Sequence, residues 1–102
     1  MYYNVILSSN SDVYFILTYS TSSDIEEKIR IEIKKNSVPI INETILPKKG
    51  MEIYREKSDG YIYDVFAHWN NQTSNVLFKP NGLNTLTLSI EAGLISFQEI
   101  TD

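Results

Sequence analysis

The sequence has no cysteine and no apolar run long enough to cross a membrane. Without cysteine, neither a disulfide framework nor a thiolate metal site can form. A membrane-spanning helix needs about 20 apolar residues, so we expect no membrane insertion. Residues 1–4 carry no basic side chain and the apolar stretch 5–7 is short, so no signal peptide is visible.

Basic residues are also scarce. Nine Lys and Arg residues stand against 13 Asp and Glu residues, which gives a net charge of -4. Because non-specific nucleic-acid affinity comes from clustered Lys and Arg, we expect no nucleic-acid partner. The 102 residues, with a hydrophobic content of 42%, are typical of one globular domain spanning residues 1–102.

What the sequence does contain is apolar and polar side chains alternating with a period of two. The clearest examples are residues 29–34 and 85–90. A pleated strand places such alternating side chains on opposite faces of a sheet. Further strand-like segments are residues 2–8, 13–20, 38–41, 51–55, 61–69, 76–78 and 94–97. The pattern predicts an all-β, single-domain antiparallel β-sandwich, a jelly roll of about eight or nine short strands.

No catalytic motif accompanies these segments. His68 is the one histidine, and it has no partner at a recognised catalytic or ligand spacing. The carboxylates are scattered, so we predict no catalytic residue, no cofactor and no enzyme activity. A calcium site built from Asp12, Asp24 or Asp59 is a remaining alternative. Their spacing matches no known calcium loop, so we expect no metal site.

The most suggestive local group lies at the end of segment 61–69, where Trp69 is followed by amide side chains. An aromatic ring can stack on the apolar face of a pyranose, and planar amides can hydrogen-bond its hydroxyls. The residues predicted to bind a ligand are Trp69, His68, Asn70, Asn71, Tyr61 and Tyr63. The alternative is that Trp69 closes the core of the sandwich, and the two tyrosines have the same ambiguity.

Two segments have an order that occurs in a known group of proteins. Residues 13–20 read Val-Tyr-Phe-Ile-Leu-Thr-Tyr-Ser. Residues 76–97 contain Gly82, then Asn-Thr-Leu-Thr-Leu at positions 84–88, and a second glycine, Gly93. This order resembles the galactose-binding-like jelly rolls, in particular the carbohydrate-binding modules of bacterial glycoside hydrolases and the third domain of insecticidal crystal toxins. The chain departs from them at Val13, where they have Tyr, and at Thr18, where they have Arg. Gln98 stands at the approximate place of an Asp that often helps to bind calcium in the carbohydrate-binding modules. The resemblance implies a jelly-roll fold and a glycan ligand, without the calcium.

Two functions of different classes follow. The first is a non-catalytic, lectin-like carbohydrate-binding module whose partner is a glycan or cell-surface polysaccharide. The richness in Asn, Ile, Lys and Tyr suggests an AT-rich Gram-positive source, hence an extracellular or cell-surface bacterial location. The alternative is a self-assembling, homo-oligomeric subunit of a filament, capsid or phage tail, joined by strand edges and apolar contacts. The strand at residues 13–19, apolar on both faces, favours this alternative.

Overall fold

The computed structural model of the chain describes residues 13–21, 25–82 and 84–101. These residues form eight strands and no helix, and so none that could span a membrane. The strands are β1 (Val13–Thr21), β2 (Ile29–Lys35), β3 (Val38–Ile45), β4 (Glu52–Ser58), β5 (Tyr63–Trp69), β6 (Gln72–Phe78), β7 (Asn84–Glu91) and β8 (Leu94–Thr101). The predicted strand at residues 2–8 lies outside the described residues.

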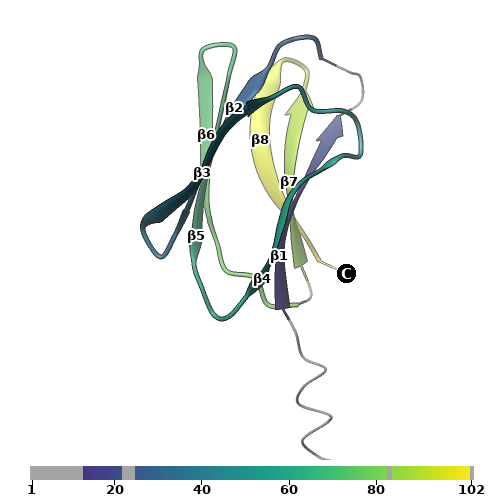
Figure 1. The fold of residues 1–102 in the computed structure, drawn as a ribbon. Coiled ribbons are helices and arrows are strands. Elements are labelled where there is room, and N and C mark those ends of the chain that lie inside the picture. The colour runs from purple at the N-terminus through teal and green to yellow at the C-terminus, as the bar shows by residue number, and fades with distance from the viewer. Residues whose placement is uncertain (1–12, 22–24, 83, 102) are drawn as a thin grey trace, which may run out of the picture.

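The strands form two four-stranded sheets. The first sheet has the order β4-β1-β7-β8 and the second the order β3-β2-β5-β6. Figure 1 shows the two sheets as facing layers. All pairings are antiparallel except that of β1 with β7, which is parallel. The prediction of an all-β sandwich is therefore confirmed.

The core forms from the side chains that alternate inward along each strand. In β5 the residues at every second position, from Tyr63 to Trp69, are buried, whereas those between them are half-buried. The ring of Phe15 in the first sheet stacks on that of Tyr63 in the second, with centroids 4.1 Å apart. Burial of one such large apolar side chain contributes roughly 1.5–3 kcal/mol. The alternation therefore fixes which face of each strand points between the sheets.

β1 carries apolar side chains on its outward face as well as on its inward face. β1 is an interior strand, paired with β4 on one side and with β7 on the other. The outward ring of Tyr14 is 39% exposed, and the guanidinium of Arg55 lies 5.7 Å from its centre. A long cationic side chain can thus cover an apolar ring from outside.

Three hairpins close through two-residue turns. The central residues are Asn36 and Ser37, Asn70 and Asn71, and Ala92 and Gly93, all with positive φ. Two positive φ values in a two-residue loop define a type I′ turn, which matches the twist of the flanking strands. Asparagine tolerates the left-handed conformation, so the chain reverses at Asn70 and Asn71 and β6 begins directly at Gln72.

Candidate active site

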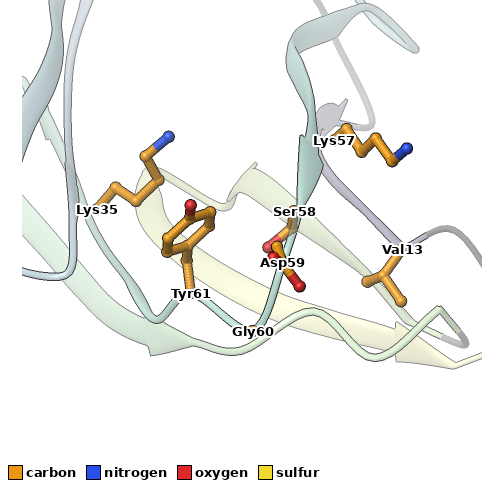
Figure 2. A pocket seen from close by; sticks show the side chains of 7 residues that line it. All are labelled: Val13, Lys35, Lys57, Ser58, Asp59, Gly60 and Tyr61. Carbon is orange, nitrogen blue, oxygen red and sulfur yellow. The ribbon is translucent and has the colours of Figure 1, made fainter.

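The connection from β4 to β5 forms one side of a cavity of about 560 Å³. Gly60, in this connection, has φ +74°, and a Cβ there would meet no atom within 4 Å. Its backbone conformation, and not lack of space, therefore favours glycine. The cavity is lined by Val13, Lys35, Lys57, Ser58, Asp59, Gly60 and Tyr61. Figure 2 shows Lys35 and Tyr61 on one side of Gly60 and Asp59 with Ser58 on the other.

A carboxylate beside this cavity joins the two sheets. Glu56 of β4 accepts hydrogen bonds from the hydroxyls of Tyr54, at 2.6 Å, and of Tyr63, at 2.5 Å. The ammonium of Lys35 lies 3.3 Å from the same carboxylate. Tyr63 and Lys35 belong to the second sheet and Glu56 to the first. The Glu56 cluster, made of these four residues, therefore links the sheets through polar contacts.

The pKa values of the Glu56 cluster follow from burial and hydrogen bonding. Burial opposes ionisation of Glu56, but the hydrogen bonds from Tyr54 and Tyr63, together with Lys35, outweigh it and lower its pKa below 4.5. Burial, followed by the bond to Glu56, raises the pKa of Tyr54 to about 12. The same two causes raise the pKa of Tyr63. The carboxylate is thus ionised and both phenols are neutral at neutral pH.

Asp59 is the described aspartate that lines the cavity. Its side chain is exposed at the end of the sandwich. Asp64, by contrast, lies on β5 and accepts a hydrogen bond of 2.5 Å from the amide of Asn75. The remaining aspartates lie outside the described residues: Asp12, Asp24 and Asp102. Of the two described aspartates, Asp59 is therefore the one that lines the cavity.

A second hollow, of about 410 Å³, lies at the other end of β5. It is lined by Lys28, Arg30, Thr44, His68, Trp69, Asn70, Asn71, Gln72 and Thr73. His68 faces Thr73 across the β5–β6 hairpin, next to the pair Trp69 and Gln72 that closes the turn. The position of the hairpin turn thus sets which side chains meet at this hollow.

His68 is held between two hydrogen-bonding partners. Its Nε2 lies 2.6 Å from Oε1 of Glu32, and its Nδ1 lies 3.1 Å from Oγ1 of Thr73. The guanidinium of Arg30 also donates to Oε1 of Glu32, at 2.7 Å. The hydrogen bond with His68, followed by the bond and charge of Arg30, holds the pKa of Glu32 below 4.5. Glu32 is therefore ionised at neutral pH.

The structure brings together four of the six residues predicted to bind a ligand. His68, Trp69, Asn70 and Asn71 line the second hollow. Tyr61 lines the cavity beside Asp59 at the other end of β5, and Tyr63 is fully buried in the core. Trp69 is 8% exposed, so its indole packs in the core as the alternative expectation had it.

Sequence reasoning missed the partners of His68. Glu32 lies 36 positions away in the chain and Thr73 five positions away. The alternation of β2 indicated that Glu32 points outward, but only the pairing of β2 with β5 brings it beside His68. The turn sequence around Asp59 predicts at most a calcium ligand there. In the described part of the chain, no group of three or more His, Asp or Glu side chains is placed to hold a metal ion.

Comparison with known proteins identifies the family. The sequence model of the spumavirus aspartic protease (A9) family matches residues 1–92, and the chain belongs to this family. No curated protein and no solved structure gives a significant match.

This membership corrects the functional predictions. The prediction that the chain is not an enzyme is wrong, because the matched family is that of a protease. Carbohydrate binding and the alternative of a structural assembly subunit are wrong for the same reason. The prediction of a bacterial, extracellular or cell-surface location is wrong because the family is viral. Alternating strands and Gly or Asn turns occur in every kind of β-sandwich, so they could not distinguish between families.

Proposed function

We propose that this member of the spumavirus aspartic protease family is a protomer of a peptidase in which Asp59 is the catalytic aspartate. The observation that carries the proposal is the placement of Asp59, which is exposed and lines a cavity of about 560 Å³. Asp64 is instead hydrogen-bonded to Asn75 away from that cavity. The family membership supplies the class of reaction.

Peptide hydrolysis by this class of enzyme needs two carboxyl groups that share one proton. Like charges about 3 Å apart cannot both ionise, so one group stays protonated. The ionised group takes a proton from the attacking water, and the protonated group donates to the carbonyl oxygen of the scissile bond. A site with a single aspartate is therefore half of the catalytic apparatus.

A second copy of the chain supplies the other half. A two-fold axis places the same residue of both protomers close together, so an axis beside the β4–β5 connection would bring two Asp59 carboxyls face to face. Ile62 lies in the same connection and is 48% exposed, which provides an apolar contact for the second copy. The proposed peptidase is thus a symmetric dimer.

Lys35 lines the cavity, but its ammonium pairs with Glu56. Figure 2 shows Lys35 on the far side of Tyr61 from Asp59. Its ammonium lies 3.3 Å from Glu56 and 4.7 Å from the centre of the Tyr61 ring. Because Glu56 neutralises Lys35, this ammonium does not compete for the carboxyl of Asp59.

The test is cleavage of a mixed peptide library at pH values from acidic to neutral, with the products sequenced by mass spectrometry. We expect cleavage by the wild type and a loss of about a hundredfold or more in Asp59→Asn, since an acid–base group typically contributes that much. Asp64→Asn is the matched control, because it makes the same chemical change outside the cavity, and we expect it to cleave like the wild type. Equal cleavage by Asp59→Asn and the wild type, or no cleavage by the wild type, would overturn the proposal.

A further inference from the structure

The second hollow holds a chain of three side chains from three strands. Thr73 of β6, His68 of β5 and Glu32 of β2 follow one another with separations of 3.1 and 2.6 Å. A hydroxyl, an imidazole and a carboxylate in this order form the arrangement in which a base activates a nucleophile and a third group orients the base. This arrangement of Thr73, His68 and Glu32 does not include Asp59.

The proton positions follow from the partners. An ionised carboxylate only accepts hydrogen bonds, so the proton of neutral His68 sits on Nε2 and is donated to Glu32. Nδ1 is then the acceptor for the hydroxyl of Thr73. The Phe66 ring stacks parallel to the imidazole, with an interplanar angle of 5° and centroids 6.4 Å apart. The base is therefore held in the tautomer that can take a proton from Thr73.

The strand register explains why these side chains meet. His68 and Thr73 are directly opposite and one pair from the turn-closing pair Trp69 and Gln72. In a two-residue hairpin this is a non-hydrogen-bonded pair, whose side chains approach more closely. Glu32 is opposite Phe66 and so lies diagonal to His68.

The charged residues that line this hollow are cationic. Lys28 and Arg30 line it, and none of the lining residues is acidic. Arg30 uses one nitrogen for Glu32, at 2.7 Å, and the same nitrogen lies 3.5 Å from the amide oxygen of Asn42. A guanidinium has five N–H donors, so others are available for a ligand. This lining favours a small substrate that carries a negative charge.

We propose that Thr73, His68 and Glu32 form an acyl-transfer site that hydrolyses small anionic esters. The Oγ1 of Thr73 forms a bond to the acyl carbon while its proton passes to Nδ1 of His68. The ester C–O bond then breaks, and the departing alcohol takes that proton. Water next attacks the acyl-threonine and gives its proton to His68; the bond from the acyl carbon to Thr73 breaks, and Thr73 recovers the proton. Arg30, which lines the same hollow, supplies positive charge that attracts the anionic substrate.

This site is separate from the proposed peptidase site. The two lie at opposite ends of β5, and a strand of seven residues spans about 20 Å. The acyl-transfer reaction needs neither Asp59 nor a second protomer. Loss of one activity therefore leaves the other measurable.

The experiment uses the full chain with two probes that differ in charge: 4-acetoxybenzenesulfonate, which is anionic, and 4-acetoxybenzenesulfonamide, which is neutral. We expect an acetyl group on the peptide that contains Thr73, detected by mass spectrometry after a rapid acid quench, and faster turnover of the anionic probe. Thr73→Val keeps the side-chain shape and should abolish the adduct. His68→Gln should slow acetylation about a hundredfold or more.

Two controls separate this proposal from a polar contact without activity. Thr85→Val makes the same chemical change on the other sheet, and Asp64→Asn alters a side chain of β5 that lines neither hollow; both should be acetylated like the wild type. Arg30→Gln should remove the preference for the anionic probe. Hydrolysis by Thr73→Val at the wild-type rate would show direct reaction with the imidazole and overturn the proposal. Absence of any adduct on Thr73 would overturn it as well.

Discussion

Two carboxylates accept hydrogen bonds from side chains of β5: Glu56 from Tyr63 at its start and Glu32 from His68 near its end. They differ in their surroundings. Glu56 lies between the sheets, with 19% of its side chain exposed, and bonds to Tyr63 and Lys35 of the opposite sheet. Glu32 lies on the outer face of the second sheet, with 28% of its side chain exposed, and bonds to His68 and Arg30 of the same sheet. Hydrogen bonds weigh more in a buried setting. Glu56 therefore holds the two layers together, whereas Glu32 is free to orient a reactive side chain.

Removal of Glu56 should give the largest change in stability. In Glu56→Ala the hydroxyls of Tyr54 and Tyr63 lose their acceptor and Lys35 loses its counter-ion. We expect the free energy of unfolding to fall by about 2–3 kcal/mol, the cost of leaving buried partners unsatisfied. Urea unfolding followed by circular dichroism measures it. Glu32→Ala is the matched control, and a loss as large as that of Glu56→Ala would refute the distinction.

Acidification should reduce the stabilisation by Glu56, with a smaller effect on the free energy of unfolding. The pKa of Glu56 in the folded chain lies below its ordinary value of 4.5, so the folded state binds fewer protons than the unfolded state near this pH. The stabilisation is fully present above pH 4.5 and is lost as the pH falls through the folded pKa. We expect the stability difference between wild type and Glu56→Gln to shrink on acidification below pH 4.5. A difference that stays constant in urea midpoints would contradict this account.

Substitutions in the turns at the two ends of β5 should give the smallest changes in the free energy of unfolding. Gly60 has φ +74° and Asn71 has φ 62°. We expect Gly60→Ala to lower the free energy of unfolding by about 1 kcal/mol, because a Cβ makes the left-handed conformation unfavourable. Asn71→Gly should change it by only a few tenths of a kcal/mol, since both residues tolerate that conformation. Thermal melts of the two variants compare them, and equal melting temperatures would show that the β4–β5 connection relaxes around the new methyl group.

The strands that could be predicted are those in which apolar and polar residues alternate along the sequence. The isoleucines of β2 and the leucines of β7 occupy every second position, and both sets are buried in the core. The parallel pairing of β1 with β7 could not be predicted, because it joins residues about 70 positions apart and alternation does not encode which strands become neighbours. The same holds for Glu56, whose four-residue cluster spans both sheets.

The candidate sites show this limit more sharply. The alternation in segment 61–69 places His68 and Trp69 on opposite faces near a strand end, but it does not predict that Glu32 meets His68. Asp59 stood in a plain turn sequence, and its cavity is completed by Val13 and Lys35 from distant strands. Tyrosine and tryptophan occur both in cores and at sugar sites. The residue types alone therefore could not distinguish a carbohydrate-binding module from a protease.

The most direct test of the account is the activity of mixed protomers. Wild type and Asp59→Asn are mixed in different ratios in the unfolded state, refolded together, and assayed for peptide cleavage at constant total protein. If two Asp59 carboxyls act across a two-fold axis, only dimers with two wild-type protomers are active, so an equal mixture has about one quarter of the wild-type activity. An equal mixture with half of the activity would show that each protomer acts alone and would contradict the account.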